Sequence, residues 1–326
     1  MDRRYAAGDL LDKAVDWRIQ DTAYEKGRLA RNVRVLRQTL NRIRPDALVT
    51  YNWGAIEWAL ASFGRACPHI HIVDGFGPEE ADRQLLRRVL FRRFAFARNT
   101  TVVVPSRTLK DIVTSVWRIA PTNVAYVPNG IDCTRFDRVR DAKLAETFGL
   151  TPDNLVIGTV AALRPEKNLE RLIRAFHGLA EDESLRLVIV GDGAERPKLE
   201  HCARELRIAD QVVFTGYLSD PAPILSVFDI FALSSDTEQM PISVLEAMAS
   251  RLPVAGVDVG DVRHIVSDRN KAYIVERDVD RLRNVLSALA NDATLRDQLG
   301  TANRQHVQEV YDETMMVNAY ARIFDG

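Results

Sequence analysis

Two glutamates eight positions apart dominate the stretch SSDTEQMPISVLEAMA, residues 234–249. Glu238 lies among polar loop residues, whereas Glu246 lies in an apolar run that Pro241 can open as a helix. A carboxylate in such a run is costly to bury unless it is paired or hydrogen-bonded. Either a group of the protein or a ligand such as a ribose diol must satisfy Glu246. The residues alone leave both interpretations open.

The first turns of two predicted helices offer chemistry for anions. Free backbone amides around Gln239 and Met240 would point outward with the positive end of a helix dipole, which suits phosphate or sugar hydroxyls. In RPEKN, residues 164–168, Lys167 could place a point charge on a diphosphate, and Arg164 could assist from another direction. A solvated first turn is the alternative interpretation of this segment.

Two glycine turns follow predicted strands further along. Gly191 opens GDGAER and Gly216 opens GYLSD. A dinucleotide fingerprint would need a third glycine where this chain has Arg196. We expect tight turns that let backbone approach a ligand, with plain turns as the alternative.

The first half of the chain supplies three further candidates. Asp74 follows the run HIHIV, where it could bind a hydroxyl of a substrate or act only as a turn residue bonded to its own backbone. Asn52 and Trp53 follow the run ALVTY and could line an acceptor site, although a tryptophan there could equally pack in the core.

Short β-rich runs alternate with helical patterns and must position these residues. Strands are predicted at 47–51, 69–73, 100–105, 124–128, 155–160, 185–191, 211–216, 229–234, 252–258 and 272–275, with helices beginning near Glu79, Arg107, Leu169, Glu195, Pro223 and Pro241. Strict alternation predicts parallel sheets with helices on both faces, and ligands then bind beyond the carboxyl ends of the strands. We expect an α/β fold of two doubly wound, Rossmann-like domains facing a cleft. Their predicted limits are 1–145, joined by a closing helix at 311–326, and 146–310.

Composition narrows the class of protein. A net charge of −1 argues against a general nucleic-acid binder, and the three separated cysteines fit neither a disulfide framework nor a zinc cluster. No stretch is long and apolar enough to cross a bilayer, so a cytoplasmic protein is expected. Two basic helical segments, 26–44 and 83–98, predict solvated faces or attraction to anionic lipid. In the second, Leu86, Val89, Leu90 and Phe94 are expected to face the core and the arginines the solvent.

Five motifs in order resemble a known family: PNGID (128–132), GTVAALRPEKN (158–168), LVIVGDG (187–193), VVFTGYL (212–218) and the glutamate pair followed by Ala-Met-Ala. Residues 45–326 resemble the retaining GT-B glycosyltransferases of family 4, the glycosyl transferases group 1. The resemblance implies that Glu238 lies by the donor sugar and that Glu246 binds the ribose of the nucleotide. It places Asp74 where many members carry a histidine near the reacting sugar.

The chain departs from the family pattern in several places. Ala162 stands where an arginine usually pairs with the lysine, and Asp261 and His264 stand where a glycine and a glutamate are common. PNGID also arrives early, and no strand is predicted before residue 47. We therefore expect part of the N-terminal domain to be lacking.

The resemblance implies transfer of a sugar from a UDP- or GDP-sugar, with retention, to a glycan or lipid-linked acceptor. Polysaccharide or glycolipid assembly, with peripheral association at the inner membrane face, is the expected setting. Neither a cofactor, a metal nor a nucleic-acid partner is expected. Alternatives are a nucleotide-sugar-binding protein without turnover, a GT-B epimerase and, disfavoured by the missing glycine, a nicotinamide-dependent oxidoreductase.

Overall fold

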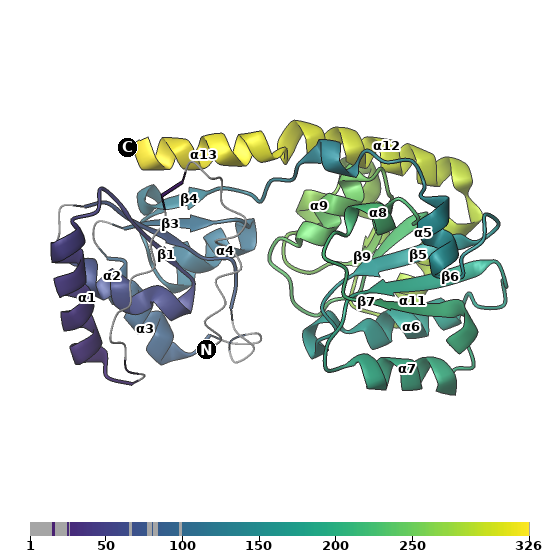
Figure 1. Ribbon diagram of the computed structural model, residues 1–326, viewed down its shortest axis with the longest axis horizontal. Helices are drawn as coiled ribbons and strands as arrows, with labels where there is room; N and C mark the ends of the chain where they lie inside the picture. The colour runs from purple at the N-terminus through teal and green to yellow at the C-terminus, as the bar shows by residue number, and fades with distance from the viewer. Residues whose placement is uncertain are drawn as a thin grey trace.

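A computed structural model describes residues 15–16, 25, 27–64, 67–76, 80, 84–97 and 100–325. In this part of the chain two lobes, each built on a parallel sheet, lie side by side (Figure 1). All ten predicted strands are confirmed, most of them shortened by one to three residues; the strand predicted at 252–258, for example, spans Val254–Val257, and the one predicted at 272–275 spans Ile274–Val275. The helix start predicted near Glu79 lies outside the described residues.

The first lobe contains the four-stranded sheet, in the order β1-β2-β3-β4. Its strands are β1 (Leu48–Tyr51), β2 (His69–Ile72), β3 (Thr100–Val104) and β4 (Val124–Tyr126), and its helices are α1 (Leu29–Ile43), α2 (Ile56–Ser62), α3 (Leu86–Ala95) and α4 (Arg107–Asp111). Val102 and Val104 of β3 pack on one face with Val89 and Trp117, whereas Val103 packs on the other face. The alternation of β3 thus buries both faces of the sheet.

The second lobe contains a six-stranded sheet, in the order β10-β9-β8-β5-β6-β7. Its strands are β5 (Leu155–Val160), β6 (Leu185–Val190), β7 (Val212–Gly216), β8 (Ile230–Leu233), β9 (Val254–Val257) and β10 (Ile274–Val275). Its helices are α5 (Ala142–Thr147), α6 (Leu169–His177), α7 (Arg196–Glu205), α8 (Ala222–Leu225), α9 (Ile242–Ala249), α10 (Val262–Ile265), α11 (Val279–Asn291) and α12 (Ala293–Val310). The strand order reverses between β5 and β8. The loops that follow these two strands therefore diverge to opposite faces and leave a crevice at the carboxyl edge.

The end of the chain ties the two lobes together. Helix α12 packs on the second lobe, and α13 (Glu313–Asp325) continues over the first (Figure 1). Met316, Ala319 and Tyr320 of α13 cover Ile70 and Val103 of the first sheet. The domain limits at 145 and 310 stay predictions.

The predicted orientation of α3 is wrong. Of the expected core face only Val89 is buried, whereas Leu86, Leu90 and Phe94 are 72%, 53% and 63% exposed. The reason is a buried carboxylate, Glu80, which is 2% exposed and draws the arginines of the helix inward.

Two arginines of α3 hold that carboxylate. Arg92 donates to both Glu80 oxygens at 3.0 and 2.7 Å, and Arg88 donates at 2.9 Å. The guanidinium of Arg92 also lies 5.0 Å from the centroid of Trp53 and 4.7 Å from that of Trp117. A bidentate ion pair stacked between aromatic rings satisfies the buried charges, and it fixes which face of α3 turns outward.

Candidate functional site

The crevice between β5 and β8 brings Lys167 and Glu238 together. Lys167 ends a 3₁₀ turn, Pro165–Lys167, after β5, and Glu238 lies in the loop after β8. Lys167 Nζ donates to Glu238 Oε1 at 2.6 Å, and Ser235 Oγ donates to the same oxygen at 2.7 Å. The side chains are 24% and 10% exposed, so the ion pair is largely screened from water.

A second set of bonds fixes the two loops to each other. Asp236 accepts from Asn168 Nδ2 at 2.9 Å and from Arg171 Nη2 at 2.7 Å, and its backbone N–H donates to Glu166 O at 2.8 Å. Asn168 adopts a left-handed conformation, with φ 40°, and its side chain caps α6. Lys167 therefore sits at a rigid strand-to-helix junction that aims it at Glu238.

This ion pair lies in a cleft of about 850 Å³ between the lobes. The cleft is lined by Asp74, Gly75 and Phe76 from the first lobe and by Arg164, Pro165, Glu166, Lys167, Thr237, Glu238, Gln239 and Met240 from the second. Six of the candidate residues from the sequence line it. Glu246, Gly191, Gly216, Asn52 and Trp53 are not among its lining residues.

Arg164 and Met240 differ in how they meet the cleft. The Arg164 side chain is 68% exposed and lies 3.9 Å from the Glu166 carboxylate, which leaves it free to turn toward an anion. Met240 is buried, and its carbonyl accepts from Asn129 Nδ2 of the PNGID segment at 3.2 Å. Met240 thus anchors the loop that carries Glu238.

Glu246 is half-buried and lies on α9, the helix that follows the loop of Glu238. Burial raises the pKa of its carboxyl, and Arg135 and Asp220, which pair with each other at 2.6 Å, are the charged groups that act on it. Within the described residues its carboxylate meets no hydrogen-bond donor and no ion-pair partner. The interpretation in which the protein itself satisfies Glu246 therefore has no contact in its favour, and the carboxylate is available to a ligand.

The glycine turns pack the strand-end loops closely. Gly191 has φ +136°, and a Cβ built on it would lie 1.9 Å from Ala161 O, so only glycine fits there. Its N–H donates to Gly216 O at 2.9 Å. The two glycines join the loops after β6 and β7 at the edge of the sheet, behind the β5 loop that carries Lys167.

In the first lobe, Asn52 supports Asp74 from the neighbouring strand end. Asn52 Oδ1 accepts from the Asp74 N–H at 3.0 Å, and Asn52 itself has a left-handed φ of 51°. Asp74 lines the cleft, and burial raises the pKa of its carboxyl. Trp53 is engaged instead with the arginines of α3, including Arg88 at 4.7 Å.

Sequence reasoning gave no role to Asp261, which connects the lobes. It is 2% exposed, and its carboxylate accepts from the N–H groups of Arg107 and Thr108 at 2.6 and 3.0 Å and from Thr108 Oγ1 at 2.8 Å. It therefore caps α4 from the opposite lobe. Its own N–H donates to Gln239 O at 2.9 Å. In the sequence, Asp261 was indicated only by its place in a loop that follows a predicted strand.

Gly260 makes this contact possible. It has φ +55°, and a Cβ built on it would lie 2.3 Å from Glu238 O. Ser106, the N-cap residue of α4, donates from Oγ to Gln239 Oε1 at 3.4 Å. The loop of Glu238 thus touches the first lobe through Gln239 and through its neighbour Asp261.

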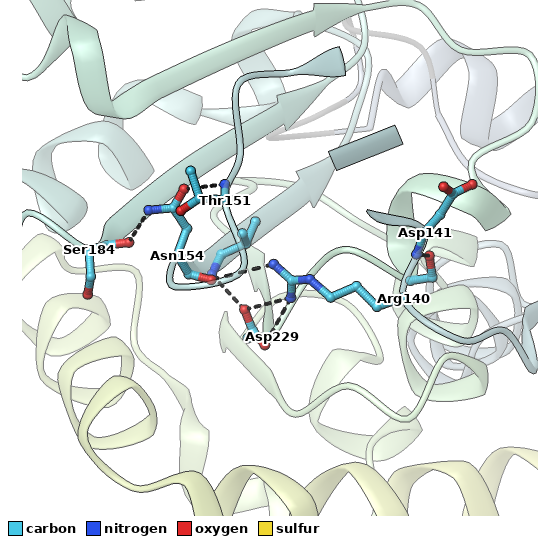
Figure 2. Close-up of polar contacts among 8 residues, drawn as sticks. Arg140, Asp141, Thr151, Asn154, Ser184 and Asp229 are labelled. Atoms are coloured by element: carbon cyan, nitrogen blue, oxygen red, sulfur yellow. Dashed lines mark hydrogen bonds and ion pairs between the residues drawn. The ribbon is translucent and has the colours of Figure 1, made fainter. Parts of the chain in front are cut away.

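A second hollow, of about 560 Å³, lies at the other edge of the six-stranded sheet, because Asn154, Ser184 and Asp229 directly precede β5, β6 and β8. Figure 2 shows Arg140 reaching Asp229, at 3.4 Å to each oxygen, and the Asn154 carbonyl, also at 3.4 Å. Asn154 in turn accepts from Thr151 N at 2.8 Å and donates to Ser184 O at 3.1 Å. The polar groups of these residues are hydrogen-bonded to one another, so we assign this hollow a structural role in joining the strand starts.

The described residues contain neither a metal cluster nor a membrane span. No group of three or more His, Cys, Asp and Glu side chains there could hold a metal ion. No helix in the same residues is long and apolar enough to span a membrane.

Two parallel-sheet α/β lobes with a cleft at the switch point of the second sheet define the GT-B glycosyltransferase architecture. The chain belongs to the glycosyl transferases group 1 family: the sequence model of this family matches residues 142–306. The model of Glycosyltransferase Family 4 matches residues 15–135. The family expectation drawn from the five motifs is confirmed.

Curated relatives are similar over part of their length. N-acetyl-alpha-D-glucosaminyl L-malate synthase of Bacillus anthracis is 25% identical over 203 residues, 62% of this chain and 53% of the relative. UDP-Gal:alpha-D-GlcNAc-diphosphoundecaprenol alpha-1,3-galactosyltransferase of Escherichia coli is 26% identical over 69% of this chain and 61% of its own. GDP-mannose-dependent alpha-mannosyltransferase of Mycolicibacterium smegmatis is 32% identical over 62% and 52%. The chain spans between half and two thirds of these relatives.

Solved structures share the fold. A glycosyltransferase from Rickettsia africae superposes with a TM-score of 0.79 at 15% identity, over 94% of this chain and 83% of that one. Alr3699/HepE of Anabaena, in complex with UDP, superposes with a TM-score of 0.78 at 19% identity, over 90% and 81%. At these identities the likeness shows the architecture alone.

Proposed function

We propose that this protein transfers a sugar from a nucleoside-diphosphate sugar to a glycan or lipid-linked acceptor, with retention of the anomeric configuration. The observation that carries the proposal is the half-buried carboxylate of Glu246, which has no partner in the described residues. Glu246 lies on α9, the helix that follows the loop of Glu238, and that loop lines the cleft with the Lys167–Glu238 ion pair. The cationic and the anionic group of that pair match the two halves of such a donor, its diphosphate and its sugar hydroxyls.

The diphosphate binds where positive charge is concentrated. Lys167 and the exposed Arg164 both line the cleft, and α9 begins at Ile242, two positions after the cleft-lining Met240, so the positive end of its dipole lies at that end of the segment. Glu246 accepts hydrogen bonds from the ribose diol. The named substrates of the relatives from E. coli and M. smegmatis carry UDP and GDP, respectively, so both bases are candidates for this chain.

Glu238 orients the donor sugar for transfer. Its second oxygen, Oε2, is left for sugar hydroxyls, because Lys167 and Ser235 both bind Oε1. As the bond from the anomeric carbon to the diphosphate oxygen breaks, Lys167 and the α9 amides stabilise the charge that develops on the leaving group. The acceptor oxygen bonds to the same face of that carbon, and its proton passes to the departing phosphate oxygen.

The acceptor approaches from the first lobe. Asp74, held through its N–H by Asn52, lines the same cleft as the ion pair from the opposite lobe, and it binds a hydroxyl of the acceptor or of the donor. In this scheme the charge on the diphosphate is met by protein groups, so we propose turnover without a metal ion.

A titration of UDP and of GDP into the purified protein by calorimetry tests the donor site. Wild type should bind one nucleotide saturably, and Glu246→Ala should weaken that binding at least about 10-fold, because the ribose loses charge-assisted hydrogen bonds. Glu205→Ala, a change on the exposed face of α7, is the matched control and should bind as wild type does. Binding of neither nucleotide by folded wild-type protein would contradict the proposal.

A second candidate, a donor-binding protein without turnover, is favoured by Ala162, which stands where the family commonly has a cationic partner for the lysine. Sugar transfer from the nucleotide sugar whose nucleotide binds separates the two functions. Release of a transferred product supports the enzyme, and binding without any product supports the binding protein. Conversion of the donor without an acceptor would indicate an epimerase.

A further inference from the structure

The side chains of the cleft between the lobes supply little positive charge for the ligand proposed to bind there. Among the described residues that line it, two are cationic and three carry carboxyl groups: Arg164 and Lys167, and Asp74, Glu166 and Glu238. A diphosphate adds several negative charges to such a site, and like charges at short range repel each other. The carboxylates of the cleft therefore oppose diphosphate binding unless the ligand itself compensates for them.

Glu238 neutralises its cation more effectively than Glu166 does. Glu238 Oε1 lies 2.6 Å from Lys167 Nζ, and both side chains are largely buried. The Glu166 carboxylate lies 3.9 Å from Arg164, whose side chain is mostly exposed. An ion pair screened from water keeps much of its strength, whereas one in solvent contributes little. An ammonium has three N–H groups, so Lys167 can reach a phosphate while it stays bound to Glu238, but its charge is then already neutralised.

The structure holds Glu238 in place beside Lys167. Ser235, which is 2% exposed, donates from Oγ to the same Glu238 oxygen at 2.7 Å. The carbonyl of the next residue, Gln239, accepts from the Asp261 N–H at 2.9 Å, a bond that does not involve the Glu238 side chain. Glu238 therefore stays beside Lys167 when a diphosphate arrives, and a change of its side chain leaves the loop anchored.

We propose that Glu238 makes the site discriminate against a bare nucleoside diphosphate in favour of the intact nucleotide sugar. The inference rests on the proposed function and deepens it. Hydroxyls of the intact donor's sugar donate to the Glu238 carboxylate, so the charge of Lys167 becomes available to the diphosphate. A nucleoside diphosphate has no transferable sugar, so Glu238 keeps neutralising Lys167 and the apparent affinity falls. After transfer, the spent nucleotide therefore leaves the site more readily.

Calorimetric titration of UDP and of GDP into the full chain, as wild type and as Glu238→Gln, tests the inference. The nucleotide should bind to Glu238→Gln at least about fivefold more tightly than to wild type, because the amide keeps the shape of the carboxylate without its charge. With UDP-galactose or GDP-mannose as the probe of the same base, the gain should be smaller. The reason is that the amide also weakens the hydrogen bonds from the sugar hydroxyls.

Glu166→Gln is the matched control. It removes a carboxylate from the same cleft without releasing Lys167, and the Glu166 carbonyl, which accepts from Asp236 N at 2.8 Å, remains. This variant should raise the nucleotide affinity about twofold or less. An equal gain in both variants would overturn the proposal. So would a nucleotide affinity that is unchanged or lower in Glu238→Gln, or an equal gain for nucleotide and nucleotide sugar. Each of these results leaves the proposed function intact, whereas binding of neither nucleotide by either protein would overturn both.

Competitive amine labelling, read by mass spectrometry, follows Lys167 without any ligand. Because Lys167 loses its ion-pair partner, it should label at least about threefold faster in Glu238→Gln than in wild type. Lys198 is the internal reference: it is 62% exposed and lies 3.0 Å from the Glu170 carboxylate, so it should label equally in both proteins. Equal labelling of Lys167 would mean that Glu238 does not hold its charge in solution, and this result would also overturn the proposal.

Discussion

Asp261→Ala removes the carboxylate that caps α4 from the opposite lobe. The N–H groups of Arg107 and Thr108 and the Thr108 hydroxyl lose their acceptor, at 2.6, 3.0 and 2.8 Å. An N-cap stabilises a helix by about 1 kcal/mol, and hydrogen bonds to a charged acceptor contribute about 1.5–3 kcal/mol each. The variant also no longer has the cost of burying the carboxylate, which offsets part of this loss. We expect a net loss on the order of 3 kcal/mol.

The lost free energy should mainly destabilise the contact between the two lobes. The donors belong to the first lobe and the acceptor to the second, so separation of the lobes, which lets water replace the carboxylate, avoids most of the cost. A change of about 3 kcal/mol shifts the ratio of open to closed molecules roughly 100-fold toward the open form. The Glu238 loop should loosen as well, because the Asp261 N–H binds Gln239 O.

Small-angle X-ray scattering and a fluorophore pair, with one dye on each lobe, measure this shift. Asp261→Ala should increase the radius of gyration and broaden the distance distribution between the lobes. Asp292→Ala is the control: Asp292 caps α12 through Leu295 N at 2.9 Å within one lobe, so this variant should lose stability without a change in lobe spacing. If Asp261→Ala keeps the wild-type distance distribution while its unfolding midpoint falls, the cap is only structural and the reasoning about the lobes is refuted.

Three further predictions concern stability. Gly191→Ala should cost at least about 2 kcal/mol in chemical denaturation, because the added Cβ meets backbone at 1.9 Å, whereas Gly54→Ala, with nothing within 4 Å, should stay within about 0.5 kcal/mol of wild type. Arg92→Met should cost on the order of 3 kcal/mol, because Glu80 loses its bidentate partner, and adding Glu80→Gln should recover part of that loss. Burial lowers the pKa of His69 to about 4, so the unfolded chain takes up a proton as pH falls below about 6.5 while the folded chain does not. The contribution of His69 to stability is therefore present above this pH and should fall by about 2 kcal/mol between pH 7 and pH 5, and His71, whose pKa burial lowers to about 3, should add a similar decline. Urea titrations at both pH values should show a smaller decline for His69→Gln, and an unchanged decline would contradict the assignment.

Local sequence pattern was sufficient for much of the fold and for placing Lys167 and Glu238 at one edge of the second sheet. Runs such as LVIGTV and LRLVIVG are short, β-branched and apolar throughout, which is what a parallel strand buried on both faces requires. Because the loops that follow such strands gather at one edge, the sequence alone could place Lys167 and Glu238 on the same side of the second sheet. The structure puts their charged atoms 2.6 Å apart.

The periodicity of α3 led to the wrong face for a physical reason. Both faces of LRRVLFRRFA carry a helical repeat, one of leucine and phenylalanine and one of arginine, and burial of apolar side chains favours the first. Glu80 reverses the outcome, because a buried carboxylate needs its charge satisfied, and Arg88 and Arg92 are within reach. That partner lies in a separate segment, so the repeat within the helix carries no information about it.

The sequence by itself determined the alternation of strands and helices, the order of the motifs and the residue types at the strand ends, because each depends on neighbours a few positions away. Only the tertiary structure decided which charges meet: Asp261 with the start of α4 across 153 and 154 positions, Glu80 with α3, and no described partner for Glu246. Electrostatic satisfaction of a buried group depends on distances in space, and these are set by how the two lobes and their helices pack.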